Sequence, residues 1–280
     1  MEVKGYIALG LACILFLSML GSPAAAQTPR LKNIELCNGA DRTTVELQIN
    51  GCTALIESEN EKPFVLSIAY NNRGNAYSTK GDYNRAIADF DQAIKLNSGY
   101  AKPFNNRGVA YRKMGQYVRA IEDFTEAIKL NADYAVAFAN RAETYQQIND
   151  YERAALDYDE AIRLAPNLDA VWSERCWVRA ILGKLERAVE DCNAALQLDP
   201  NDGAAHDSRA LVYLKAGQID SAIDEYNRAL LIFPKLASAF YGRGLAKLKK
   251  GDTVGGEADI STAKSIKPKI ADDFLHYGIE

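Results

Sequence analysis

The sequence predicts an all-α fold, a solenoid in which six helix–turn–helix hairpins stack one after another. Two observations predict it. Shifting the sequence against itself by 34 residues superimposes Asn-Arg-Gly at 72–74 on Asn-Arg-Gly at 106–108 and on Asn-Arg-Ala at 140–142. Within each unit, apolar residues recur at helical spacing, stop at a Gly or Asn, and then resume at that spacing. Each unit is therefore expected to form two antiparallel helices.

Residues 1–26 have the pattern of a cleavable export signal. Lys4 precedes the apolar run 6–20, the helix breakers 21–23 follow, and three alanines end at Ala26, after which we expect cleavage. The alternative is an uncleaved anchor, but the apolar run is shorter than the roughly 20 residues that span a bilayer. We therefore expect a bacterial periplasmic or secreted protein with no integral membrane segment after signal cleavage.

Residues 27–66 form a lead-in that carries Cys37 and Cys52. Its stretch 49–56 resembles a degenerate second helix. The open face of a first hairpin is apolar and needs a cover, so we expect this lead-in to cap the array.

The repeats follow without insertion or deletion. We expect a hairpin in each of the units 67–100, 101–134, 135–168, 169–202, 203–236 and 237–270. A residue type that tolerates the left-handed conformation recurs between the two helices of every unit. It stands at Gly81, Gly115, Asn149, Gly183, Gly217 and Gly251. The segment 271–280 is expected to cap the last hairpin, and a ligand-like tail is the alternative.

These features together resemble the tetratricopeptide repeat. The 34-residue period, the aromatic and Gly/Ala positions of the first helix, and the Ala, Phe/Tyr, Ala and Pro of the second are typical of that family. The resemblance covers 67–270. It implies a right-handed superhelix whose concave wall of first helices binds extended peptides or a partner helix.

One departure from the family pattern recurs in every unit. An arginine precedes the Gly/Ala position where the family usually has an apolar residue, and an acid stands 16 residues later. The arginines are Arg73, Arg107, Arg141, Arg175, Arg209 and Arg243, and the acids are Asp89, Asp123, Asp157, Asp191, Glu225 and Asp259. We expect structural ion pairs that fix the angle between helices, with partner binding as the alternative.

Four cysteines remain after signal removal, an even number in an oxidising compartment. Cys176 and Cys192 replace family positions on the two helices of one hairpin, opposite each other across the turn. They are expected to form a disulfide, which leaves Cys37 and Cys52 to pair by elimination. A metal site is disfavoured because the sequence has no CxxC and no nearby His.

Binding residues are expected on the first helices, pointing away from both packing interfaces. Asn72, Asn106 and Asn140 repeat there every 34 residues, and an amide can donate to and accept from an extended backbone. This resembles the asparagine ladder of O-linked sugar transferases. The other candidates are Asn71, Asn75, Lys102, Asn105 and Trp177. Helix capping or solvation of the asparagines is the alternative.

Composition and motifs exclude other classes. A net charge of -4 and a pI near 5.4 provide no basic field for nucleic acid. No nucleophile set, phosphate loop or metal motif indicates an enzyme or a cofactor. The sequence therefore predicts a non-catalytic scaffold for a protein or peptide partner. A self-assembling envelope component, hence a homo-oligomer, and an accessory subunit of an envelope enzyme remain as alternatives.

Overall fold

The computed structural model describes residues 29–40, 43–58 and 61–279, and these residues form helices joined by short turns. Two helices precede the repeats, α1 (Pro29–Cys37) and α2 (Val45–Ile56). The repeat helices then follow in pairs: α3 (Pro63–Thr79) with α4 (Tyr83–Leu96), α5 (Ala101–Lys113) with α6 (Tyr117–Leu130), α7 (Ala135–Gln147) with α8 (Tyr151–Leu164), α9 (Asp169–Ile181) with α10 (Leu185–Leu198), α11 (Gly203–Lys215) with α12 (Ile219–Ile232), and α13 (Ala237–Lys250) with α14 (Thr253–Ile266). The last helix is α15 (Ile270–His276).

In the turns inside the hairpins, the predicted Gly and Asn positions have the left-handed backbone conformation. Gly81 has φ 77°, and Asn149, the one non-glycine among them, has φ 61°. Asparagine is among the few residues with a side chain that adopt this conformation readily. Directly after the first turn, the Asp82 carboxylate accepts a hydrogen bond from the Arg85 amide and caps α4.

Small residues allow the two helices of a hairpin to pack closely. A Cβ atom on Gly74 would lie 2.6 Å from Cε1 of Phe90, and one on Gly108 would lie 2.8 Å from the same atom of Phe124. The alanine columns of the second helices are fully buried at Ala86, Ala120, Ala154, Ala188 and Ala222. These positions form the interface between helices and leave no space for larger side chains.

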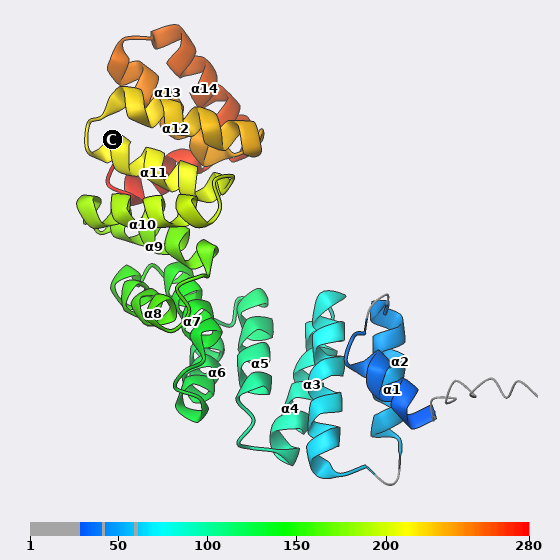
Figure 1. Cartoon of the computed structure of the whole chain (residues 1–280). Coiled ribbons are helices and arrows are strands. Elements are labelled where there is room, and N and C mark those ends of the chain that lie inside the picture. The colour runs from blue at the N-terminus through cyan, green and yellow to red at the C-terminus, as the bar shows by residue number, and fades with distance from the viewer. Residues whose placement is uncertain (1–28, 41–42, 59–60, 280) are drawn as a thin grey trace, which may run out of the picture.

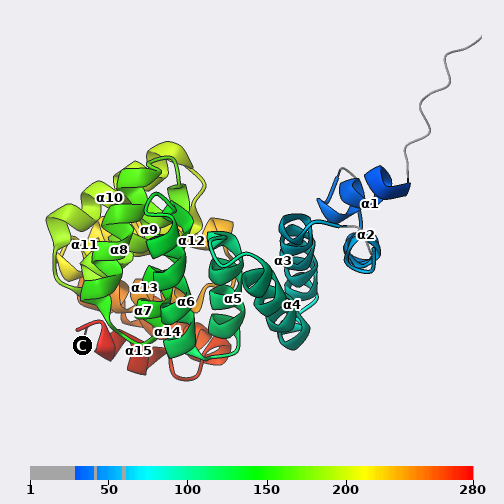
Figure 2. The same cartoon turned by 90° about the horizontal axis from the view of Figure 1, so that it is seen from below.

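Successive hairpins stack into an all-α solenoid. The second helix of each pair packs on the first helix of the next, as α4 packs on α5 and α12 on α13. Figure 1 shows this succession from α1 through α14, and Figure 2 shows the later helices gathered on one side while α1 to α4 extend to the other. Within the described residues, no helix is both long enough and apolar enough to cross a bilayer.

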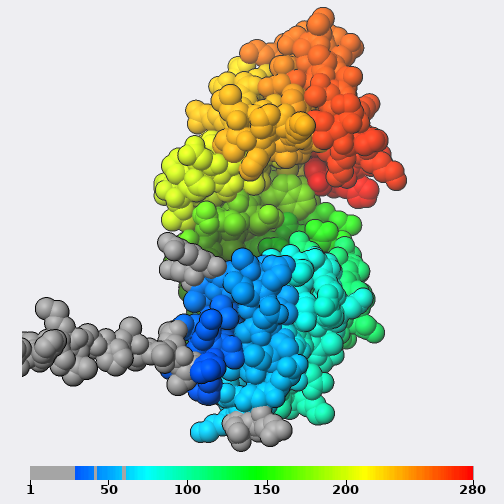
Figure 3. Space-filling view, turned by 90° about the vertical axis from the view of Figure 1, so that its right-hand side faces the viewer, coloured from blue at the N-terminus to red at the C-terminus, as the bar shows by residue number. Residues whose placement is uncertain are grey.

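The two ends differ in detail from the sequence expectations. The lead-in holds two helices, α1 and α2, where the sequence indicated one. Helix α3 begins at Pro63, ahead of the expected start at 67, because proline suits the first turn of a helix. Helix α15 packs on α13 and α14, and Figure 3 shows the C-terminal segment in red against both the last repeat and the green middle repeats. The expected export signal at 1–26 lies outside the described residues.

Candidate partner-binding groove

Each repeat arginine pairs with the acid of its own hairpin, and in five of the six pairs it donates to both carboxylate oxygens. The Arg141 guanidinium donates to both carboxylate oxygens of Asp157, at 2.7 and 2.8 Å. The same arrangement joins Arg73 to Asp89, Arg107 to Asp123, Arg175 to Asp191 and Arg243 to Asp259. The planar fork of arginine matches a carboxylate in this geometry and fixes the relative orientation of the two helices.

The fifth pair differs because glutamate replaces aspartate. Arg209 donates to a single oxygen of Glu225, Oε2, at 3.1 and 2.9 Å. The same oxygen lies 2.7 Å from Nδ1 of His206. The longer side chain therefore brings one of the two histidines of the chain into the pair.

A third contact links each arginine to the helix that precedes its hairpin, which is α2 of the lead-in for Arg73 and the second helix of the preceding repeat for the others. Nη1 of Arg141 donates to the Thr125 hydroxyl at 2.9 Å, and Nη1 of Arg243 donates to the Asn227 amide oxygen at 2.8 Å. The equivalent acceptors of the other arginines are Thr53, Asp91, Asp159 and Asn193. Each arginine thus touches three helices and fixes the step from one hairpin to the next.

Burial limits the net stabilisation that these pairs provide. Burial raises the pKa of Asp191, while the hydrogen bond from Arg175 acts in the opposite direction. In the Arg141 pair, the hydrogen bond to Asp157 raises the pKa of the guanidinium and burial opposes it. Desolvation and pairing nearly balance in such pairs, so their main effect is on geometry.

The asparagines of the first repeats form one continuous chain of side-chain hydrogen bonds. Asn140 donates to Asn105 at 2.9 Å, and Asn105 donates to Asn106 at 3.1 Å. The chain continues from Asn106 to Asn71, from Asn71 to Asn72 and from Asn72 to Asn38, at 2.9, 3.2 and 3.1 Å. Arg112 begins it by donating to Asn140 at 3.5 Å. Each side chain donates to the next member, so the chain of hydrogen bonds runs from Arg112 to Asn38.

The members of this chain differ in exposure. Asn71 and Asn105 are buried, so they link neighbouring repeats and lie away from the surface. Asn72, Asn106 and Asn140 are partly exposed. An amide has two N–H donors and two acceptor lone pairs. Each of these three uses one of each in the chain and keeps one of each for a partner.

The remaining candidate residues lie around this chain and beyond it. Asn75 and Lys102 are exposed on α3 and α5. Trp177 is partly buried on α9 and packs edge-on against Tyr151 and Tyr277, with 5.6 and 5.3 Å between ring centroids. It joins the cores of repeats three to six and also lines two surface hollows. The structure therefore separates Trp177 from the asparagine chain.

The four cysteines pair as the sequence indicated. Cys176 and Cys192 form a disulfide between α9 and α10, with 5.4 Å between their Cα atoms. Cys37 and Cys52 form another between α1 and α2, with Cα atoms 4.5 Å apart. Among the residues that the structure describes, no group of His, Cys, Asp and Glu is arranged to hold a metal ion.

Sequence reasoning missed several residues of this face. Asn38 precedes Asn72 by one period of 34, so extending the same alignment upstream would have found it. The acceptors on the preceding repeat stand two residues after an acid in five of the six cases, as Thr125 follows Asp123. Arg112 gave no periodic signal.

The fold is that of a helical-repeat interaction scaffold. Family models of the tetratricopeptide repeat match residues 67–100, 101–134 and 140–203, and a model described as TPR repeat matches 210–251. The matched ranges cover more than half of the chain. The chain belongs to the tetratricopeptide-repeat family, whose fold serves as a scaffold for interactions between proteins.

Solved structures show the same fold at low sequence identity. A tetratricopeptide repeat protein from Parabacteroides merdae is 18% identical with a TM-score of 0.65, over 89% of this chain and 98% of that one. PilW, a type IV pilus biogenesis factor, is 17% identical with a TM-score of 0.65, over 75% and 98%. YrrB, which is described with an unusual peptide-binding site, is 21% identical with a TM-score of 0.52, over 67% and 95%. The comparison with curated proteins gave no match.

Proposed function

We propose that this chain is a non-catalytic scaffold that binds an extended peptide or protein segment along Asn72, Asn106 and Asn140, outside the cytoplasm. One observation carries the proposal. These three partly exposed amides recur once in each of the first three repeats, and each keeps one donor and one acceptor. The backbone of an extended peptide offers carbonyl and amide groups at regular intervals whatever its sequence, so a ladder of this kind can bind it.

The hydrogen-bonded chain also prepares the ladder for binding. Asn106 is held from both sides by the buried residues Asn71 and Asn105. A side chain that is already fixed loses less conformational entropy when it binds a partner. Asn75 and Lys102 flank the ladder with further polar groups. The peptide-binding site of YrrB gives a precedent within the same fold.

Location outside the cytoplasm rests on two features. Residues 1–26 carry the export pattern, and both disulfides belong to the kind of compartment in which oxidised cysteines persist. N-terminal sequencing of the protein from the extracytoplasmic fraction tests this, and we expect Gln27 as the first residue. Recovery of the intact N-terminus from the cytoplasm alone would contradict it.

Affinity capture tests the binding face. The wild type and a triple variant, Asn72→Ala with Asn106→Ala and Asn140→Ala, are used to capture proteins from the exported fraction. A synthetic peptide from the captured segment is then titrated against both. We expect the triple variant to bind at least about tenfold more weakly, as loss of several hydrogen bonds would cause. Equal binding by the two proteins would remove this face from the proposal.

A matched variant separates binding from stability. Asn71→Ala with Asn105→Ala breaks the same chain at its buried members and leaves the exposed amides in place. Compared at equal folded fraction by circular dichroism, this variant is expected to bind more weakly than the wild type, because the amides are no longer held by their buried neighbours, but more tightly than the triple variant. If it loses as much as the triple variant, the amides act only on the stability of the repeats.

A further inference from the structure

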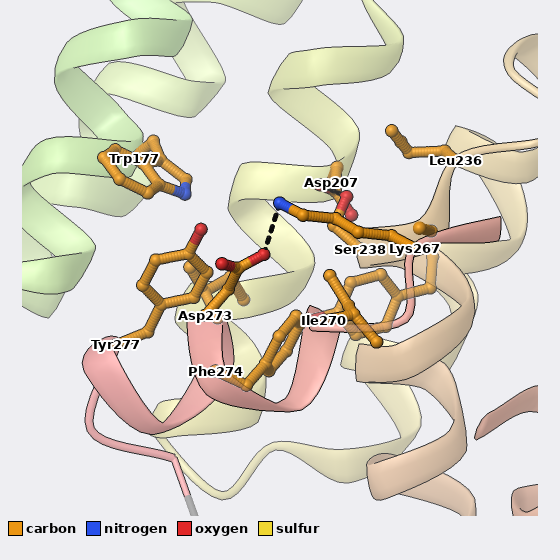
Figure 4. A pocket seen from close by; sticks show the side chains of 12 residues that line it. Trp177, Asp207, Leu236, Ser238, Lys267, Ile270, Asp273, Phe274 and Tyr277 are labelled. Carbon is orange, nitrogen blue, oxygen red and sulfur yellow. Dashed lines mark hydrogen bonds and ion pairs between the residues drawn. The ribbon is translucent and has the colours of Figure 1, made fainter. Parts of the chain in front are cut away.

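A hollow on the opposite half of the molecule is built by residues that the asparagine chain does not include. It has a volume of about 300 Å³ and lies between the repeat helices α9, α11, α12 and α13 and the C-terminal helix α15. Figure 4 shows Trp177 and Tyr277 on one side, Asp207 and Ser238 on the other, and Asp273 between them.

Asp207 places an incompletely bonded carboxylate in this hollow. Its Oδ2 accepts a hydrogen bond from the Ser238 hydroxyl at 2.7 Å. Its Oδ1 is shielded from solvent and has no hydrogen-bond partner in the described part of the chain. Burial raises the pKa of Asp207 to about 6, and the Ser238 hydrogen bond acts in the opposite direction. A buried carboxylate that is ionised at neutral pH requires a countercharge.

Tyr226 adds a second unpartnered group. It is 1% exposed and lines the hollow, and its hydroxyl has no hydrogen-bond partner among the residues that the structure describes. Buried hydroxyl groups are nearly always bonded in native structures. Oδ1 of Asp207 and the Tyr226 hydroxyl are thus both without a hydrogen bond within the described part of the chain, and a ligand that donates hydrogen bonds could satisfy them.

Aromatic rings form the other wall. The ring centroids of Phe274 and Tyr277 are 5.5 Å apart, and those of Tyr277 and Trp177 are 5.3 Å apart. Tryptophan, tyrosine and phenylalanine rings attract organic cations through their quadrupoles, most strongly where water is excluded. A carboxylate beside aromatic rings is suited to an ammonium group on an apolar stem.

The chain already brings one ammonium group to the rim. Nζ of Lys267 lies 2.5 Å from Oδ2 of Asp273, and Figure 4 shows this contact as a dashed line. The lysine is about half exposed. Lys267 pairs with Asp273 and not with Asp207. Among the described residues that line the hollow, two carboxylates therefore share a single cation.

This hollow adjoins another one. A second hollow of about 290 Å³ shares Trp177 and Asp207 and extends to Glu174, whose pKa is raised by burial. Its carboxylate accepts a hydrogen bond from Gln146 at 3.1 Å. The face therefore changes from amides in the first three repeats to carboxylates and aromatic rings in the last three.

We propose that the hollow between Asp207, Tyr226 and Trp177 binds an organic ammonium group on an alkyl stem. The ammonium group donates to Oδ1 of Asp207 and to the Tyr226 oxygen, and the stem packs against Trp177 and Tyr277. A lysine side chain of a bound peptide and a free alkylamine share this chemistry. The site is separate from the asparagine face and does not depend on a peptide binding there.

Calorimetric titration of the mature full-length chain at pH 7.5 tests the site with three probes. They are n-butylammonium chloride, the capped tripeptide acetyl-Ala-Lys-Ala-amide, and the same tripeptide with norleucine in place of lysine. We expect binding of at least one ammonium probe and none of the norleucine peptide, which has an uncharged stem of similar size. Binding of the lysine peptide alone identifies a peptide side chain as the ligand, and binding of the amine alone identifies a free amine.

Variants assign the binding to this hollow. Asp207→Asn keeps an acceptor for Ser238 and removes the charge, so it should weaken binding at least about tenfold. Lys267→Met removes the competing ammonium and should strengthen binding. Asp220→Asn changes an exposed acid that pairs with Lys250 and should have no effect. The variant with Asn72, Asn106 and Asn140 changed to Ala should bind the ammonium probes as the wild type does. Failure of ammonium binding and failure of the proposed peptide binding are therefore distinguishable. Absence of binding by both ammonium probes, or equal binding by wild type and Asp207→Asn, would overturn the site.

Discussion

The ring of Tyr277 lies edge-on to the indole of Trp177, with 5.3 Å between the ring centroids, although the two residues are 100 positions apart in the chain. Lys215 strengthens the contact by donating to the Tyr277 carbonyl oxygen at 2.7 Å. Burial raises the pKa of Tyr277 to about 12. The end of the chain is thus held against the fourth repeat as well as the last.

Removal of residues 270–280 should expose Trp177 and loosen the last repeats. Ile270 and Phe274 are 3% and 2% exposed, and each contributes about 2 kcal/mol through burial. In a Trp172→Phe background, which leaves one tryptophan, we expect the fluorescence of Trp177 to shift to longer wavelength and the melting temperature to fall. An unchanged emission maximum would show that the tail does not cover this ring in solution.

Replacement of Arg141 by Met should destabilise the protein strongly. It leaves the Asp157 carboxylate buried without its partner, at a cost of about 3 to 5 kcal/mol. Thr125→Val removes only the contact to the preceding repeat and should cost about 1 kcal/mol. Urea unfolding followed by circular dichroism measures both.

The control is Arg163→Met, which removes an exposed arginine paired with Glu160. Exposed changes of this kind stay within about 0.5 kcal/mol. If Arg141→Met has no larger effect than this control, the repeat arginines are not structural.

Loss of the disulfide in the fourth hairpin should lower stability more than loss of the one in the lead-in. Cys176→Ala with Cys192→Ala removes a crosslink worth about 3 kcal/mol in the middle of the array. Cys37→Ala with Cys52→Ala affects α1 and α2 at its end. Scanning calorimetry with and without reductant should show a larger shift for the first variant, and the opposite order would contradict this.

Asp207 should make the protein less stable as pH rises. Its pKa is about 6 when folded and about 3.9 in an unfolded chain, so the folded state binds this proton more tightly. The penalty is absent below pH 4, grows between pH 4 and 6, and is complete above pH 6. Two pKa units correspond to about 3 kcal/mol.

The comparison with Asp207→Asn isolates this effect from other carboxylates. The ionisable groups that line the same hollow are Tyr226, Lys267, Asp273 and Tyr277. They are present in both proteins. Urea unfolding at pH 4, 5, 6 and 7 should show a variant that gains stability over the wild type with rising pH. A difference that does not change with pH would contradict the assignment.

The repeat period carries most of the information about the fold. Gly74 and Gly108 recur one period apart, and Phe90 and Phe124 leave no space for a larger side chain at these positions. The period therefore predicts which helices pack as pairs. Cysteine pairing was also accessible, because Cys176 and Cys192 break the pattern on facing helices. Helix α1 gave no comparable signal, since it stands outside the repeats.

The binding face was harder to predict from the sequence than the fold. The direction of the Asn71 side chain depends on how α3 lies relative to α5, and Arg107 of α5 contacts Asp91 of α4, the helix between them in the chain. The hollow at Asp207 depends on the path of the C-terminal segment back to Trp177. Such long-range arrangements follow from the curvature of the array and leave no local pattern in the chain.

The bond between Cys176 and Cys192 has a mechanical consequence. A stacked helical array under tension lengthens as its hairpins open one by one, and the 16-residue separation across this bond cannot be drawn out. At about 3.4 Å per residue, this bond alone makes the fully stretched chain shorter by about 50 Å. Pulled from its ends, the protein should extend as two compliant arms joined by a link that stays closed until a reductant opens it.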